Sequence, residues 1–285
     1  MDYRKEFRVD PGSKAKLSKL DPAYKGKHEL QDEAKQEIDS YLKKLFQQQA
    51  LLYAEHKHSI LVVLQALDAG GKDGTIKHVF VALNPQGATV ASFKQPTATE
   101  LAHDFLWRVH PHAPGKGEIV IFNRSHYEDV LVTRVHKLID KDTWTERYER
   151  IRDFEALLAE NGTTIIKFFL HISKEEQLAR FEQRLDDPNR NWKISESDYS
   201  ERALWDDYIA AFDDAISATS TKHAPWYVIP SNHKWFRNLA VSQIMADTME
   251  DLKLSFPPPS VNLAEIRRKY HAAVKEEKGS NKKKG

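Results

Sequence analysis

The 285-residue sequence contains no cysteine. Disulfide bonds, a thiol nucleophile and cysteine-ligated metals are therefore excluded. The first twenty residues hold several lysines and arginines but lack the apolar run that a secretory signal peptide needs. Together these absences predict a cytoplasmic protein.

The sequence also lacks a marked excess of basic over acidic residues, or the reverse. The 43 lysines and arginines nearly balance the 42 aspartates and glutamates, for a net charge of +1. The overall charge therefore does not indicate nucleic acid or a membrane surface as a partner. With 40% hydrophobic and 30% charged residues, the composition is ordinary for a soluble globular protein, and the length suits one large domain or two small ones.

Short apolar runs alternate with helical patterns along the chain, which favours an α/β fold. A parallel sheet covered by helices on both faces would form three layers, and its ligands would bind at the carboxyl ends of the strands. The predicted strands are 60–64, 89–93, 118–122, 163–172 and 226–229, and the predicted helices are 30–56, 97–110, 130–138, 141–160, 174–187, 198–220 and 235–254.

Polar segments flank this pattern. Residues 1–28 are polar and are expected to form an N-terminal extended arm, followed by a main domain over 29–256. Three consecutive prolines, 257–259, are expected to end that domain. The C-terminal extension over 257–285 finishes in a basic tail, 275–285, whose composition predicts disorder.

The first apolar strand leads into a glycine-rich turn and then a helix, which is the setting of a phosphate-binding loop. Glycines let backbone N–H groups face an anion, the helix N-terminus adds partial positive charge, and Lys72 adds a full charge. A glycine-rich turn without a ligand is the alternative interpretation. The residues expected to bind phosphate or nucleotide are Ala69, Gly70, Gly71, Lys72, Asp73, Gly74 and Thr75.

The loop departs from the pattern G-x-x-x-x-G-K-[ST]. Ala66 stands at the first glycine position, Asp73 stands at the position of the metal-binding hydroxyl, and Thr75 comes two residues late. The carboxylate of Asp68 would repel a phosphate unless a divalent cation lay between them. The sequence therefore predicts a phosphate site at which Asp68 binds Mg²⁺.

Two further segments supply cations. Asn123 and Arg124 follow the strand 118–122, so Arg124 is expected at the ligand edge, although a capping asparagine and a surface arginine would look the same. Arg180 and Arg184 lie four residues apart on a predicted helix and Lys193 follows in a polar loop. This segment suits a lid that brings cations onto the transferred phosphoryl group, or a solvated helix with internal ion pairs.

Three stretches of the chain resemble the polyphosphate kinase 2 family and occur in the same order, over about residues 30–254. The stretches are LQALDAGGKDGTIKH, FNRSHYEDVLV and RFEQRLDDPNRNWKISESD. The resemblance implies a P-loop NTPase-like fold of the thymidylate-kinase type. Such a fold has three layers, αβα, with a central parallel sheet, and here it would carry a helical lid over about 174–220. It also implies Mg²⁺-dependent phosphoryl transfer between inorganic polyphosphate and a nucleotide.

The resemblance also implies roles for individual residues. Asp68, Lys72, Arg124 and Arg184 would be catalytic, with Asp68 as the metal ligand. Asn123 stands where many members carry aspartate, and Glu128 belongs to a Glu-Asp pair like that of members that accept both nucleoside mono- and diphosphates. The residues expected to bind polyphosphate are Arg180, Arg184 and Lys193, and Asn123 and Glu128 join the nucleotide and phosphate site.

Two other functions fit the same motifs. An ATP-dependent nucleoside monophosphate kinase would need an adenine pocket in addition to the acceptor site, and a phosphate-loop protein without turnover would not need Asp68, Lys72 and lid arginines together. The expected partners are polyphosphate and nucleotide substrates. A homo-oligomer, either a dimer or a tetramer, is also expected, although no residue pattern specifies it.

Overall fold

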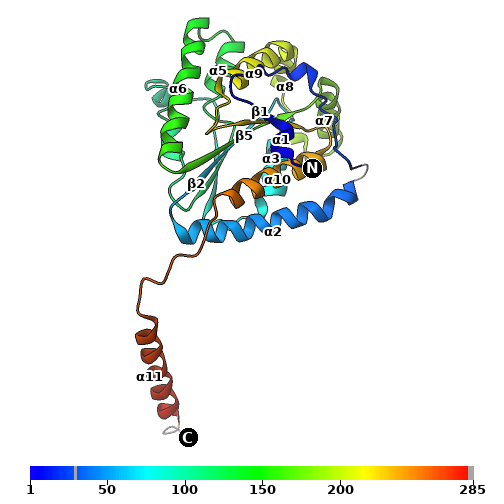
Figure 1. The fold of residues 1–285 in the computed structure, drawn as a ribbon. Helices are drawn as coiled ribbons and strands as arrows, with labels where there is room; N and C mark the ends of the chain where they lie inside the picture. Colours follow the sequence, from blue (N-terminus) through cyan, green and yellow to red (C-terminus); the bar gives the residue numbers. More distant parts are fainter. Residues whose placement is uncertain (29–30, 282–285) are drawn as a thin grey trace. The chain divides into compact units, whose positions relative to one another are not determined.

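The computed structural model describes residues 1–28 and 31–281 and divides the chain into two units. The first unit, Met1–Leu254, contains the whole sheet, and the second begins at Ser255 and contains helix α11 (Leu263–Asn281) (Figure 1). Within the described residues no helix combines the length and the apolar character that crossing a membrane requires.

The centre of the first unit is a six-stranded sheet with the order β1-β6-β5-β2-β4-β3. Strands β2 to β6 are parallel to their neighbours, which confirms the predicted parallel α/β sheet, while β1 is antiparallel to β6 and was not predicted. The strands are β1 (Arg8–Val9), β2 (Ser59–Gln65), β3 (Ala88–Ser92), β4 (Ile119–Asn123), β5 (Thr163–His171) and β6 (Trp226–Pro230).

Helices connect the parallel strands and cover both faces of the sheet. The α-helices of this unit are α1 (Tyr3–Phe7), α2 (Gln31–Glu55), α3 (Lys72–Val79), α4 (Ala98–Leu101), α5 (Glu128–Val135), α6 (Lys141–Glu160), α7 (Lys174–Asp186), α8 (Glu196–Ala203), α9 (Trp205–Thr219) and α10 (Lys234–Asp251). The described part of this unit also contains the short 3₁₀ helices η1 (Leu17–Lys19), η2 (Phe80–Ala82), η3 (His110–His112) and η4 (Asn191–Lys193).

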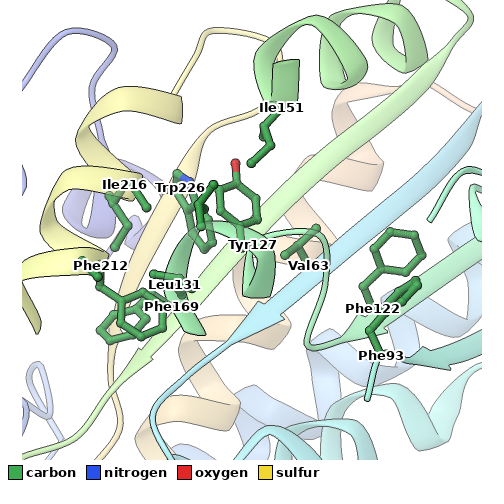
Figure 2. Packing of buried hydrophobic residues seen from close by; sticks show 14 of the residues in the cluster. Val63, Phe93, Phe122, Tyr127, Leu131, Ile151, Phe169, Phe212, Ile216 and Trp226 are labelled. Atoms are coloured by element: carbon green, nitrogen blue, oxygen red, sulfur yellow. The ribbon is translucent and has the colours of Figure 1, made fainter. Parts of the chain in front are cut away.

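The central strand β2 shows why three layers form. All seven of its residues are buried, and successive side chains of a strand point to opposite faces of the sheet. Ile60 and Val62 pack with residues of α2, α3 and α10, whereas Leu61 and Val63 pack with residues of α5, α6 and α9. Figure 1 shows α2 and α10 together on one side of the sheet, and Figure 2 shows the packing around Val63 on the other.

A charged cluster lies inside the second of these layers. Lys167 of β5 donates hydrogen bonds to Glu155 Oε2 at 2.6 Å, to Tyr127 Oη at 2.9 Å and to the carbonyl of Thr219 at 2.8 Å. Both charged side chains are completely buried. Burial lowers the pKa of Lys167, and the charge of Glu155 opposes that shift. Tyr127 also packs edge-to-face on Trp226 (Figure 2), so the ion pair sits among apolar groups.

Two predicted helices are shorter than expected. The helix predicted over 97–110 is only α4, which begins after a Thr97–Glu100 capping box; turns follow it, in which the Asp104 carboxylate accepts a hydrogen bond from the backbone N–H of Leu106. The helix predicted over 198–220 is interrupted at Leu204, so that α8 and α9 are separate. After α4, the hydrogen bond of Asp104 competes with helix propagation.

The predictions for the two ends were partly wrong. Residues 1–28 are not an extended arm, because they contain α1, β1 and η1, and Tyr3 and Leu17 are buried in the two core layers. Residues 275–281 were predicted to be disordered but belong to α11. Residues 282–285 of that predicted tail, and Leu30 of the predicted first long helix, lie outside the described residues.

Candidate active site

The predicted phosphate loop joins β2 to α3 and requires glycine at two positions. A Cβ atom at Gly70 would lie 2.5 Å from the Ala66 Cβ and 2.8 Å from the Leu67 carbonyl oxygen, and Gly71 has a φ of 105°. Ala69 also adopts a positive φ, of 58°, which costs energy for a residue with a side chain. The loop is therefore held in a specific, tightly turned conformation.

Lys72 begins α3, and its side chain folds back across the loop. Its Nζ donates a hydrogen bond to the carbonyl of Ala66 at 2.8 Å. Burial, together with the charge of Arg124, lowers the pKa of Lys72 to about 8, although the charge of Asp68 opposes the shift. A bound phosphate would favour the protonated form.

Arg124 links the loop to the second motif. It follows β4 with a φ of 64°, and its guanidinium lies 3.1 Å from Asp68 Oδ1 and 3.3 Å from Glu128 Oε2. Burial by itself would lower the pKa of Arg124, but the carboxylates of Glu128 and Asp68 outweigh it and raise the pKa. Asn123 Nδ2 donates to Asp73 Oδ1 at 3.0 Å, so both motif residues contact the loop.

The acidic groups of the site fit a metal that is held jointly with a substrate. The described residues contain no group of three or more aspartates, glutamates or histidines placed to bind a metal ion. Asp68 presents a partly exposed carboxylate, with 30% of the side chain accessible. Mg²⁺ is commonly bound through one or two carboxylates together with substrate phosphates and water. Asp68 therefore fits as the protein ligand of such an ion.

The predicted lid residues have three different environments. Lys193 Nζ lies 3.5 Å from Asp73 Oδ2, so the segment predicted to be a lid contacts the loop through an ion pair. Arg184 Nη1 donates to the carbonyl of Lys193 at 3.0 Å and thereby orders η4. Burial would raise the pKa of Asp73, but the hydrogen bond from Asn123 and the charge of Lys193 outweigh it and lower the pKa.

Arg180 is the most constrained of the lid cations. It is only 5% exposed, and its guanidinium donates to the carbonyls of Ala69 at 2.8 Å and of Ser231 at 2.5 Å. Its Nε donates to Glu176 at 2.7 Å. In this conformation Arg180 connects the phosphate loop to the segment after β6, and its hydrogen bonds are directed to the protein.

Most predicted site residues line one groove of about 1370 Å³. Thr75 does not, because it is fully buried and its hydroxyl donates to the Gly71 carbonyl. Glu128 lines a smaller adjoining pocket that also contains Tyr208 and Trp205. The predicted residues that line the groove are Asp68, Ala69, Gly70, Gly71, Lys72, Asp73, Gly74, Asn123, Arg124, Arg180, Arg184 and Lys193.

Among the described residues that line this groove, basic side chains outnumber acidic ones by nine to four. The acidic residues are Asp68, Asp73, Glu176 and Asp198, and the basic residues are Lys72, Lys94, Arg124, Arg180, Arg184, Arg190, Lys193, Lys234 and Arg237. A groove with this charge excess suits a ligand that carries many negative charges.

Lys234 and Arg237 at the start of α10 were missed by the sequence analysis. A signal was present: α10 follows β6, whose carboxyl end lies at the same sheet edge as the phosphate loop. Their spacing of three residues also places them on one side of a helix. The prediction of the last strand included no functional residue after it.

Comparisons with known proteins agree with one another. The family model described as Polyphosphate kinase 2 matches residues 27–257. The AMP/ADP-polyphosphate phosphotransferase of Meiothermus ruber is 53% identical over 259 residues, which are 90% of this chain and 96% of that protein. The ADP-polyphosphate phosphotransferase of Rhodopseudomonas palustris is 46% identical over 272 residues, with 89% and 92% covered.

A solved structure is similar over nearly the whole chain. The crystal structure of polyphosphate kinase 2 from Arthrobacter aurescens TC1 has a TM-score of 0.91 and 40% identity to this chain, and 97% of each chain is covered. The phosphate loop, the Arg124 segment and the lid all lie within the residues that the family model matches.

Proposed function

This chain belongs to the polyphosphate kinase 2 family, and from that premise we propose that it transfers a phosphoryl group from inorganic polyphosphate to a nucleotide. The observation that carries the proposal is the groove in which the phosphate loop, Arg124 and the lid cations meet. A flexible polyanion needs a row of cations without base recognition, and the excess of basic residues supplies it. The predicted phosphate-loop kinase fold is confirmed.

The proposed acceptors are nucleoside mono- and diphosphates, with adenine as the first base to test. The two relatives described above are named for ADP, and one of them also for AMP. Glu128 supports the same proposal, because the pair Glu128–Asp129 resembles that of family members that accept both nucleoside mono- and diphosphates. Guanine nucleotides are the second pair of acceptors to compare.

The proposed reaction needs positioning and charge neutralisation more than acid–base help. An ionised phosphate oxygen of the acceptor attacks the terminal phosphorus of polyphosphate. A bond forms between them, the bridging P–O bond breaks, and the shortened chain leaves with the electron pair. Lys72 and Arg124 hold phosphate oxygens in this arrangement. Asp68 would hold Mg²⁺, which when bound neutralises phosphate charge.

The direct test is to incubate the enzyme with polyphosphate, Mg²⁺ and one of AMP, ADP, GMP or GDP, without ATP, and to separate the products by chromatography. We expect each accepted nucleotide to gain one phosphate. Turnover that requires ATP as donor would instead identify a nucleoside monophosphate kinase. Nucleotide binding without turnover from either donor would identify a non-catalytic phosphate-loop protein.

The metal role of Asp68 has a separate test. Asp68→Asn keeps the size of the side chain but removes its charge, so we expect weaker Mg²⁺ binding, measured by calorimetry in the presence of polyphosphate. Unchanged Mg²⁺ affinity in the folded variant would assign the ion to another group.

Three predictions extend this proposal. The segment 174–220 acts as the lid of the kinase domain over 29–256. The protein forms a dimer or a tetramer, which light scattering coupled to size-exclusion chromatography measures. It resides in the cytoplasm, which fluorescence microscopy of the tagged full chain in its cell checks.

A further inference from the structure

Arg237 of α10 is a buried cation that has no acidic partner among the residues that the structure describes. It is 2% exposed, and none of the described carboxylates lies within ion-pair distance of its guanidinium. Its Nε and Nη2 donate to the amide oxygen of Asn238, at 3.1 and 2.8 Å. Burial, together with the nearby charge of Arg180, lowers the pKa of Arg237 to about 9. Buried arginines are usually paired with an anion.

The guanidinium of Arg237 lies against the glycines of the phosphate loop. A Cβ atom at Gly71 would overlap Nη1, and a Cβ atom at Gly74 would lie 3.1 Å from Nη2. Arg180 Nη1 is 3.6 Å from the same Cβ position at Gly71. Two guanidinium groups therefore converge on the first turn of α3, where the helix N-terminus already favours negative charge.

We propose that Arg237 is a phosphate-binding residue that holds the polyphosphate donor on the α10 side of the loop. Lys234, three residues earlier on the same helix, also lines the groove and adds to its positive charge. A phosphate bound there would supply the anion that Arg237 lacks, and a donor with a negative charge on every unit supplies one without base recognition. This inference rests on the proposed function and extends it to a residue outside the three sequence motifs.

A purely structural role is the competing explanation, because Arg237 fills space beside Gly71 and Gly74. Asn238→Asp separates the two roles. It places a carboxylate where the amide oxygen already accepts from Arg237, so the arginine stays in place but becomes neutralised. If Arg237 is only structural, the new ion pair should maintain or raise the stability and leave polyphosphate binding unchanged. If Arg237 binds phosphate, the new carboxylate should neutralise it and weaken polyphosphate binding.

The experiment compares wild type with Arg237→Gln, Arg237→Lys and Asn238→Asp. Two controls make the same charge changes on exposed surfaces outside the groove: Arg150→Gln on α6 and Gln47→Glu on α2. The measurements are the KM for polyphosphate at saturating ADP, the KM for ADP at saturating polyphosphate, the calorimetric affinity for polyphosphate alone, and the Tm.

We expect Arg237→Gln and Asn238→Asp to weaken polyphosphate binding about ten- to a hundredfold, the range for removing a hydrogen bond to a charged group. Arg237→Lys should lose less, and the KM for ADP and both controls should stay near wild type. If Arg237→Gln does not fold, the polyphosphate affinities of Asn238→Asp and Arg237→Lys show whether Arg237 binds the donor. Unchanged polyphosphate affinity in Asn238→Asp, or a rise confined to the KM for ADP, would overturn the inference. A wild type that neither binds nor uses polyphosphate would instead overturn the proposed function.

Discussion

Two charged regions of this molecule differ in how their charges are balanced. The Lys167–Glu155 cluster is completely buried, and each charge has its counter-charge within the protein. In the groove, none of the described carboxylates lies within ion-pair distance of Lys72 or Arg237, and burial lowers the pKa of both. Interior charges that are paired neutralise each other, so they do not attract a ligand. Excess cations in a groove repel one another, and a bound anion relieves that repulsion. The comparison predicts that mutations in the first region change stability and mutations in the second change kinetics.

Removing the counter-charge in the interior should have the largest effect. Glu155→Gln leaves Lys167 buried without an anion, and we expect the free energy of unfolding to fall by about 3–5 kcal/mol. Urea denaturation measures it, with Glu149→Gln on the exposed face of the same helix as the control. The KM values at temperatures well below the Tm should not change. A loss below about 1 kcal/mol would mean that this pair contributes little to folding.

Lys72→Ala should have the opposite signature. We expect turnover to fall at least about a hundredfold, because a single charged hydrogen bond to the transition state is worth roughly 3 kcal/mol in a site that excludes water. The Tm should stay near that of wild type, and Lys77→Ala, at an exposed position of the same helix, is the matched control. Steady-state rates decide the matter, and a folded Lys72→Ala enzyme with a near-normal rate would remove Lys72 from the mechanism.

The lowered pKa of Lys72, about 8, predicts a pH effect of intermediate size. The protonated form binds phosphate, so kcat/KM should fall as the pH rises through about 8 and approach a tenfold loss per pH unit above it. The same lowered pKa means that the unfolded chain holds this proton more tightly. The contribution of Lys72 to folding stability therefore rises with pH between about 8 and its ordinary pKa of 10.5. A kcat/KM that stays level from pH 7 to 9.5 would contradict the assignment.

The lid cations should show the smallest effects. We expect Arg184→Ala and Lys193→Ala to raise the KM for polyphosphate about three- to tenfold, more strongly at low salt, since partly exposed charges are screened over about 8–10 Å. The KM for the nucleotide should change far less, and Arg150→Ala is the surface control. Arg180→Ala should instead lower the Tm, because it leaves the carbonyls of Ala69 and Ser231 without their donor. If neither lid variant moves the KM for polyphosphate at two salt concentrations, the lid does not hold the donor.

The local patterns of the chain were sufficient to predict much of the fold. Period and length distinguished strands from helices, and β2, β4, β5 and β6 lie close to their predicted positions. The errors fall where a few side-chain contacts decide the backbone. Asp104 favours turns over helix after α4, and the short strand β1 has too few residues for a periodic signal.

The sequence by itself determined the phosphate loop, because the glycines, Lys72 and the preceding apolar strand are contiguous and each residue has a local reason. It also indicated Arg124, since the carboxyl ends of parallel strands share one edge. Only the tertiary structure decided which cations keep free hydrogen-bonding capacity. Arg180 and Arg237 are both buried arginines. Among the described residues, however, Arg180 donates to four protein oxygens, whereas Arg237 donates only to the amide oxygen of Asn238. Three partners of Arg180, the carbonyls of Ala69, Ser231 and Asn232, come from segments distant in the sequence, so residue order does not reveal them. The direction in which Arg237 points depends on how α10 is rotated against its neighbours, which residue order does not reveal either.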